Sequence, residues 1–486
     1  MISKELIEEI LSVALSRGGD FAEVFVENKR VTGIGLEDGK IERMQSGTDI
    51  GAGIRVISGE ATAYAHTNEL SREGLLRSAD VVARALGNGD ESRSFDLRTL
   101  RPTVEFPVSE APDEVTAEHK VDVLRQADRA ARAVDREVIK QVMVGYGDVV
   151  QEVTVGNSEG VFVEDRRVRT RFLVNAVAAK DGVIQTGYEA VGTVTGFELF
   201  KMYDPTQMAA TAAQRAKSLL DAEPAPSGKM PVVLAGEAGG TMVHEACGHG
   251  LEADLLQKGL SVYSGMLGEI VADPSVTVID DATLPDRYGS YAFDDEGVQS
   301  QPVTMIKDGV LTDFLYDRLT ARKEGRESNG HGRRESHQHK PVPRMANTYI
   351  APGKADPEGL IKDVAEGVLV RKMGGGQVNT TTGDFVFEVA EGYLIQDGEV
   401  GSMIRGATLT GNGPEVLRRV SAVGSDLGFT IGTCGKEGQG VPVSDAQPTL
   451  LFTADQDEDL PISVGGTKMR GKANAELHKQ PEIRRI

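Results

Sequence analysis

The first 90 residues alternate between helical and strand-like patterns of apolar side chains. Residues 2–13 carry apolar residues every three to four positions, and Ser3 is placed to cap a helix there. Ser71 stands before a second helical pattern, with Glu73 in its first turn. Between the helices, strand-like runs separated by turn signals lie at 21–27, 32–36, 40–44, 51–57 and 61–66. Two helices beside a meander of strands predict an α+β module.

A second group of elements follows a polar, proline-containing stretch at 90–112. We expect a helix over 116–134, strands over 137–195 and a helix over 205–222. The segment EPAPSGK at 223–229 combines two prolines with small residues. Its composition predicts a linker between domains.

The pattern changes after this linker. A short apolar strand at 230–234 and a helix at 237–248 are expected first. The remainder is rich in glycine and in strand-like runs joined by Asp-Gly and Asn-Gly pairs, which predicts a large, irregular, mostly antiparallel β domain.

The predicted fold class is therefore α+β. A helix-and-sheet domain at 1–222, which can be divided into modules at 1–90 and 113–222, precedes a β-rich domain at 230–486.

The charge of the chain restricts its partners. The 486 residues include 74 acidic and 53 basic ones, and the formal net charge is −21. This charge repels phosphate backbones and anionic lipids, so we expect neither a nucleic-acid binder nor a membrane-surface binder. The start of the chain lacks the pattern of a secretory signal, and no run of about 18 apolar residues could span a membrane. A cytoplasmic location is expected. Two cysteines are too few for a disulfide framework.

The densest group of chemically active side chains is GTMVHEACGHGLEAD at 240–254. Imidazole, thiolate and carboxylate groups are all zinc ligands. His244 and His249 are one residue further apart than the histidines of a His-Glu-x-x-His helix, and on a regular helix they would point roughly 140° apart. They can bind one ion only if the helix contains a π-type turn or ends before His249. Gly248 and Gly250 would ease either distortion.

Two other arrangements of this segment stay open. His244 and Cys247, three residues apart on a regular helix, could form a ligand pair. Alternatively, Glu245 and His249, four residues apart, could form an ordinary pair on a partly buried helix.

A catalytic zinc site usually has three protein ligands, so another must come from elsewhere in the chain. Cys434 lies in the glycine-rich segment FTIGTCGKEGQGVPVSD, although a lone cysteine is more often an inert buried thiol. The other candidate is the loop NGHGRRESHQHKPVPRM at 329–345. This loop is interpreted either as a solvated, mobile segment or as a basic lid at 326–344 that attracts carboxylates. The candidate substrate-binding residues are Arg333, Arg334, His337 and Arg344.

Five ordered motifs in the second half of the chain form a specific pattern. They are HEACGHGLEAD (244–254), NGHGRRES (329–336), PRMANTYIAPG (343–353), GGQVNTTTGDFVFEVAEGYLI (375–395) and GTCGKEGQGVPV (432–443). With these motifs the chain resembles the TldD/PmbA family of metalloproteases, and specifically its TldD-type, catalytically competent branch. The resemblance implies that His244, His249 and Cys434 are the metal ligands and that Glu245 is the catalytic base. It also implies that the β-rich domain carries the zinc helix, with Cys247 at a variable position.

The resemblance implies a zinc metallopeptidase that hydrolyses peptide bonds of unfolded or extended polypeptides. One zinc ion per active subunit would polarise the scissile carbonyl and lower the pKa of its bound water, whose proton Glu245 would take. An extended peptide could pair with an exposed strand edge. The resemblance further implies a dimer, formed either with a related subunit that lacks the zinc motif or with a second copy.

Two hypotheses compete with this function. A non-catalytic peptide-binding or chaperone-like subunit with structural zinc would need a fourth protein ligand, such as a histidine from 331–339. Thiol chemistry at Cys247, beside His244, would need a reactive thiolate.

Overall fold

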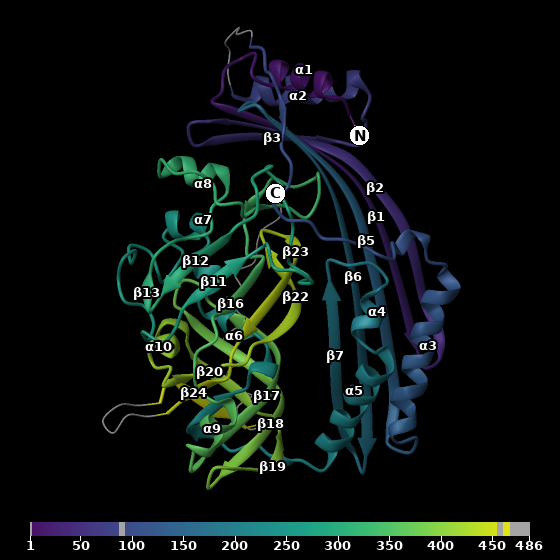
Figure 1. Ribbon diagram of the computed structural model, residues 1–486, viewed down its shortest axis with the longest axis vertical. Helices are drawn as coiled ribbons and strands as arrows, with labels where there is room; N and C mark the ends of the chain where they lie inside the picture. Colours follow the sequence, from purple (N-terminus) through teal and green to yellow (C-terminus); the bar gives the residue numbers. More distant parts are fainter. Residues whose placement is uncertain (1, 87–92, 454–459, 467–486) are drawn as a thin grey trace, which may run out of the picture.

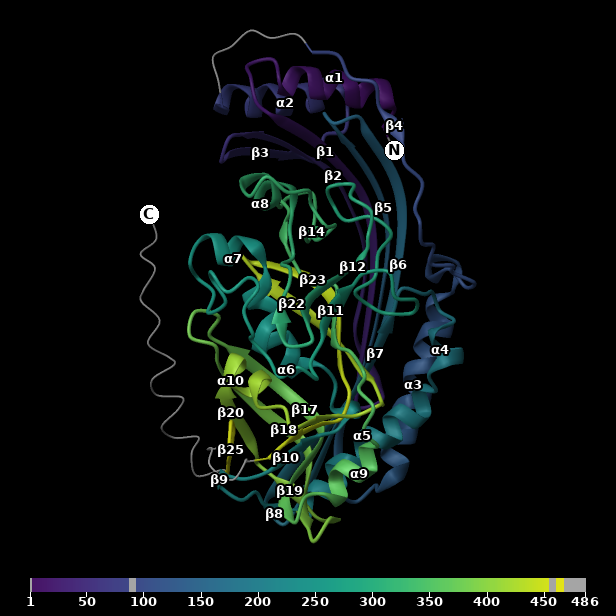
Figure 2. The ribbon, with the colours of Figure 1, turned by 60° about the vertical axis from the view of Figure 1, so that its left-hand side comes forward.

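The structure, a computed structural model, describes residues 2–86, 93–453 and 460–466. Figures 1 and 2 show two parts: a long curved sheet with helices on its outer side, and a β-rich part against its inner side. The mixed helix-and-strand fold class is as predicted. Among the helices of the described residues, none is both long and apolar enough to cross a membrane.

The curved sheet has the strand order β3-β2-β1-β5-β6-β4, with β7 paired to the far part of β6. Its neighbours are antiparallel except for the short β4, which is parallel to β6. Because β1 pairs with β5, residues from both suggested modules, 1–90 and 113–222, share this sheet. The strands are β1 (Phe21–Glu37), β2 (Lys40–Ser58), β3 (Ala61–Thr67), β4 (Arg98–Thr99), β5 (Ile139–Asn157), β6 (Val161–Lys180) and β7 (Val183–Thr193).

Two of these strands are longer than the sequence pattern predicts. Separate strands were expected at 21–27 and 32–36, but residues 28–31 continue β1 and pair with β2 and β5. Residues 45–50 likewise join the two predicted halves of β2. These middle sections are largely exposed, so their side chains lose the apolar alternation. The backbone pairing continues through them because it does not depend on side-chain polarity.

The helices of this part all cover one face of the sheet. Val24 of β1 packs with α1 and α2, whereas Ile34 of β1 packs with α3 and α5 at the other end. Phe25 points to the opposite face and packs against Phe293 of the β-rich part, as the two-residue period of a strand requires. Ser3 caps the first helix, as expected. The helices are α1 (Lys4–Ala14), α2 (Arg72–Leu86), α3 (Ala117–Val134), α4 (Leu199–Met202) and α5 (Pro205–Leu220).

The β-rich part contains a ten-stranded and a six-stranded sheet. Most pairs are antiparallel, as predicted, but β10–β17, β8–β19 and β16–β23 are parallel. The segment 223–229, predicted to be a linker, contributes β8 and β9 to the larger sheet. That sheet contains β8 (Glu223–Pro224), β9 (Gly228–Lys229), β10 (Val232–Leu234), β17 (Glu366–Val378), β18 (Asp384–Gln396), β19 (Glu399–Arg405), β20 (Thr408–Asn412), β21 (Ala422–Val423), β24 (Leu450–Phe452) and β25 (Ile462–Gly465).

The six-stranded sheet has the order β13-β12-β11-β16-β23-β22, which leaves β22 at its edge. Its strands are β11 (Val278–Asp281), β12 (Pro302–Lys307), β13 (Val310–Leu311), β16 (Asn347–Ile350), β22 (Gly428–Lys436) and β23 (Gln439–Gln447). The short strands β14 (Gly332–Arg333) and β15 (Val342–Pro343) pair with each other. The remaining regular helices are α7 (Ala253–Gln257), α8 (Arg318–Lys323), α9 (Pro357–Lys362) and α10 (Gly413–Arg418).

Buried ion pairs join the curved sheet to the β-rich part. Arg55 of β2 lies 3.0 Å from Glu23 of β1 and also pairs with Glu296. Arg334 pairs with Glu23 at 2.6 Å. These side chains are at most 1% exposed, so each charge depends on its partners for compensation.

We predict that Arg55→Leu lowers the free energy of unfolding by about 3–5 kcal/mol, because the substitution leaves buried carboxylates without their cation. Urea unfolding followed by circular dichroism measures the change. The control is Arg77→Leu, since the ion pairs of Arg77 lie at the surface and should contribute little. An Arg55→Leu protein that unfolds at the wild-type urea concentration would contradict the prediction.

Candidate metal centre

A π-helical turn brings His244 and His249 to the same side of the chain. The segment consists of η2 (Gly236–Ala238), α6 (Thr241–Val243), the π-helix η3 (His244–Gly248) and η4 (His249–Leu251). The backbone N–H of His249 donates to the carbonyl of His244, the five-residue bond that defines a π-turn. The two ring centroids lie 5.0 Å apart. The π-type distortion expected from the five-residue spacing is therefore present, in place of the single helix predicted at 237–248.

The glycines beside His249 have a different role from the one expected. Gly248 has φ −51° and ψ −58°, which any residue can adopt, so its backbone is not distorted. A side chain there would instead begin 2.2 Å from Sδ of Met345. At Gly250, a side chain would begin 2.9 Å from the ring of Tyr263. The two glycines allow close packing around the π-turn.

Cys434 supplies a third donor from the edge strand β22. Its Sγ lies 3.4 Å from Nε2 of His249, and one ligand atom from each of His244, His249 and Cys434 lies within 4.8 Å of the others. These are the three residues for which the motifs suggested a shared ion. They come from a π-turn and from a strand nearly 190 residues later in the chain.

Buried carboxylates orient both imidazole rings. Nδ1 of His244 lies 2.7 Å from Asp445, and Nδ1 of His249 lies 3.1 Å from Glu252. With Nδ1 engaged, Nε2 is the nitrogen available to an ion. Lys436 binds Glu252 at 3.0 Å and offsets its negative charge. The residues Asp445, Glu252 and Lys436 were not identified from the sequence, although all three lie in or beside the motifs around His249 and Cys434.

The electrostatics favour a thiolate at Cys434. Burial alone would raise the pKa of this thiol, but hydrogen bonds with His244 and His249 lower the pKa to about 5. Burial alone would lower the pKa of His249, but Glu252 and Cys434 raise it to about 10. Thiolate is the ligand form of cysteine, whereas both imidazoles must release a proton when an ion binds. Two nitrogen donors and one thiolate at this spacing fit a zinc ion.

Glu245 lines the same cleft as the three donors. The cleft has a volume of about 650 Å³ and also contains residues of β17 and β22. Burial raises the pKa of Glu245, although the nearby histidines oppose this effect. A carboxylate with a raised pKa is better suited to accept a proton near neutral pH.

Residues of two strands line this cleft: residues 374–378 at the end of β17 and residues 431–436 of β22. Within the described residues, β22 pairs only with β23, so its other edge is unpaired. The cleft shares lining residues such as Thr241 and Ile431 with a cavity of about 1300 Å³ that reaches β7 of the curved sheet.

The basic loop is not the exposed lid that the sequence suggested. The side chains of its four candidate residues are buried and bind groups of the chain itself. Arg333 donates to the carbonyl of Pro442 at 2.9 Å, Arg334 pairs with Glu23, and His337 lies 2.9 Å from Glu27. Arg344 donates to the carbonyls of Cys434 and Gln439 and so supports the strand that carries the thiolate. The mobile-loop and lid interpretations fail because these four side chains are buried and bind acceptors of the chain itself, while direct contact with substrate stays a prediction.

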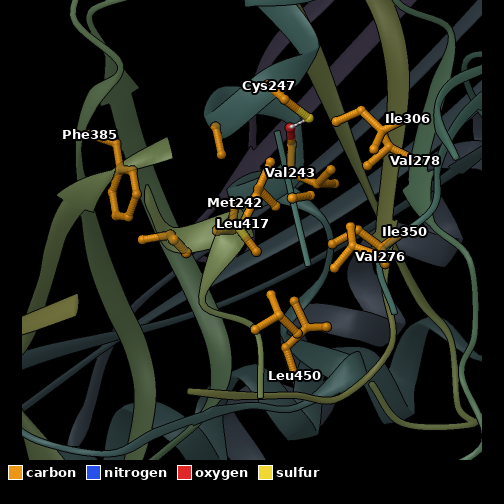
Figure 3. Packing of buried hydrophobic residues seen from close by; sticks show 14 of the residues in the cluster. Met242, Val243, Cys247, Val276, Val278, Ile306, Ile350, Phe385, Leu417 and Leu450 are labelled. Atoms are coloured by element: carbon orange, nitrogen blue, oxygen red, sulfur yellow. Dashed lines mark hydrogen bonds between the residues drawn. The ribbon is translucent and has the colours of Figure 1, made fainter. Parts of the chain in front are cut away.

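Cys247 has no role as a reactive thiol. It is fully buried in the apolar core beside Met242, Val243 and Leu417 (Figure 3). Its Sγ donates to the carbonyl of Val243, and burial raises its pKa to about 12. The hypothesis of thiol chemistry at this position is wrong, because the thiolate would be unstable there.

The histidines of the basic loop do not complete a closed zinc site. His331 binds Asp280 at 3.0 Å, and His337 binds Glu27. Over residues 2–86, 93–453 and 460–466, the group of metal-ligand atoms at the site contains His244, His249 and Cys434 and no fourth residue. Three protein donors leave a position for substrate or water, as in catalytic zinc sites.

Comparisons with known proteins identify the family to which the chain belongs. Three family models match the chain: PmbA/TldA metallopeptidase domain 1 at 22–86, the central domain at 110–220 and the C-terminal domain at 227–455. A "Metalloprotease TldD homolog" of Haemophilus influenzae is 36% identical over 96% of this chain and 97% of its own. A "Metalloprotease" of Methanothermobacter thermautotrophicus is 37% identical over 88% of this chain and 93% of its own.

A solved structure shares the fold. TldE from Thermococcus kodakarensis superposes with a TM-score of 0.74 at 20% identity, covering 94% of this chain and 99% of its own. Together with the family models, which match most of the sequence, these likenesses show that the chain belongs to the PmbA/TldD family of metallopeptidases.

Proposed function

We propose that the protein is a zinc metallopeptidase that cleaves unfolded or extended polypeptides. The observation that carries this proposal is the convergence of His244, His249 and Cys434 on one point, with Glu245 in the same cleft. Membership of a metallopeptidase family supports the reaction class. The donor set supports zinc in particular, because imidazole and thiolate together favour zinc over magnesium or calcium.

A bound zinc ion would supply Lewis acidity toward the scissile carbonyl. Glu245 acts as the general base: its carboxylate takes a proton from the attacking water and passes it to the leaving amine. Asp445 and Glu252 keep His244 and His249 in one orientation and one tautomer.

The walls of the cleft favour an extended substrate. An unpaired edge on β22 can form backbone hydrogen bonds with a peptide in strand conformation. Backbone bonds of this kind carry little sequence information, so broad specificity is expected. The strands of a folded protein are already paired, so a folded substrate must unfold before it can enter the cleft.

The proposal also includes a dimer, in which this chain pairs with a second subunit. The likeness to TldE supports pairing with a related subunit that lacks the zinc motif, while a homodimer is the other arrangement. In either case this chain, which has the full donor set, is the proposed active partner. The non-catalytic subunit with structural zinc is less well supported, because the described residues provide three donors and not four.

We predict that Glu245→Gln retains zinc and lowers kcat on an unstructured peptide by about 10²–10⁴-fold, because the amide cannot accept the proton. Peptide cleavage followed by mass spectrometry, with zinc measured by elemental analysis, tests this. Glu237→Gln, at an exposed position shortly before the zinc turn, is the matched control and should retain activity. If Glu245→Gln keeps its zinc and cleaves at the wild-type rate, the proposed mechanism is wrong.

Asp445→Asn should weaken zinc binding by about 10–100-fold, because the amide no longer holds His244 as a strong acceptor. Competition with a chromophoric chelator measures the affinity. The comparison is Asp308→Asn, an acidic residue at an exposed turn, which should bind zinc like the wild type. Unchanged zinc affinity in Asp445→Asn would show that this carboxylate does not support the ligand.

A further inference from the structure

A second group of metal-ligand side chains lies between the curved sheet and the basic loop. It contains Glu27 of β1, Asp49 of β2 and His337 of the loop, and one ligand atom of each lies within 4.8 Å of the others. Glu27 and His337 are buried, whereas Asp49 is half-buried. The three residues come from segments up to 310 positions apart, so only the tertiary structure brings them together.

His337 has the hydrogen-bonding pattern of a metal ligand. Its Nδ1 lies 2.9 Å from Oε1 of Glu27, and its backbone N–H donates to the same oxygen at 2.6 Å. Its Nε2 is buried and has no hydrogen-bond partner. A buried nitrogen without a partner carries a desolvation cost, which a bound ion would remove. The histidines of the first site likewise bind a carboxylate through Nδ1.

Two glycines of the curved sheet leave space for His337 and for Tyr64, which binds it. A side chain at Gly51 would begin 2.2 Å from Nε2 of His337, so the imidazole occupies space that only glycine leaves free. At Gly53, the space is taken by Tyr64, whose hydroxyl donates to the carbonyl of His337 at 2.7 Å. The position of His337 on the sheet is therefore specified by contacts on both sides.

A second imidazole, that of His66, lies at the exposed side of this group. His66 of β3 is exposed and lies opposite Gly53, on the same face of the sheet as Glu27 and Asp49. Its ring centroid is 6.2 Å from that of His337, with 67° between the planes. The corresponding values for His244 and His249 are 5.0 Å and 87°. A modest movement of the exposed His66 side chain would give His66 and His337 a geometry similar to that of His244 and His249.

We propose that Asp49, His66 and Nε2 of His337 form a second site for a divalent transition-metal ion, in which Glu27 orients His337 through Nδ1. Imidazole and carboxylate donors together suit zinc, cobalt or manganese. The site contains no thiolate and lies against the N-terminal sheet, so it differs from the first in both chemistry and location. Its expected role is structural, because Glu27 and His337 are buried between the curved sheet and the basic loop.

The second site is connected to the first through the basic loop. Glu335, two residues before His337, accepts a hydrogen bond from the backbone N–H of Gly440 at 2.6 Å. Its own N–H donates to Oε1 of Gln439 at 3.2 Å. Gln439 and Gly440 lie at the start of β23, opposite Lys436 and Gly435 of β22. An ion at His337 would therefore steady the hairpin that carries Cys434.

Cobalt titration of the metal-free, full-length protein tests the proposal. Co²⁺ at the first site gives a sulfur-to-cobalt charge-transfer band, whereas Co²⁺ at the second gives only ligand-field bands. The wild type should bind two ions per chain. Only one of them should contribute to the sulfur-to-cobalt charge-transfer band. The Cys434→Ser protein should retain the second ion and lose the sulfur band.

Asp49→Asn is the decisive variant, because the side chain of Asp49 makes no hydrogen bond or ion pair within the described residues and the substitution should leave the fold intact. The substitution should lower the affinity for the second ion by at least about 10-fold and leave the sulfur band unchanged. Glu42→Gln, at an exposed position on the same strand, is the control and should bind two ions. A wild type that saturates at one ion, or an Asp49→Asn protein that binds both ions with wild-type affinity, overturns the proposal and leaves Glu27 and His337 as a buried hydrogen-bonded pair.

Discussion

The π-turn between His244 and His249 is the constraint on which the candidate metal centre depends. On a regular helix these side chains diverge, and the π-turn with its five-residue hydrogen bond to the carbonyl of His244 brings them together. Such a turn is less stable than an α-helix, so its surroundings must hold it. Tyr263 donates to the carbonyl of Ala246 at 3.0 Å, and Gly413 allows the backbone of α10 to approach the same residue closely. The core around the turn therefore contributes directly to the geometry of the site.

A second level of support positions Cys434. This residue lies on an edge strand, which by itself would be free to move. Arg344 binds its carbonyl, and Lys436 joins β22 to Glu252, the residue that orients His249. The buried cations of the loop and strand thus help to position the candidate ligands Cys434 and His249. They also explain why a chain with a charge of −21 keeps several arginines and lysines in its interior.

The curved N-terminal sheet also contributes buried contacts to the β-rich part. It donates Glu23, Glu27 and Arg55 to buried contacts with the loop and with Glu296. Its strand β7 bounds the large cavity that continues from the metal cleft. The cavity therefore lies between two parts that buried ion pairs hold together.

Much of this protein was determined by local sequence. Ser3 and the apolar periodicity specified the first helix, and the alternation at 21–27 specified the start of β1, because caps and periodicity act over a few residues. The five-residue spacing of His244 and His249 predicted a widened or interrupted turn if both bind one ion, and the family resemblance implied Cys434 as the third ligand. Tertiary structure decided the rest. It joined split strand signals into β1 and β2, buried the basic loop, and selected Asp445 and Glu252 as orienting carboxylates. These outcomes depend on contacts between residues far apart in the chain, and neither periodicity nor spacing records which buried charge will meet which partner.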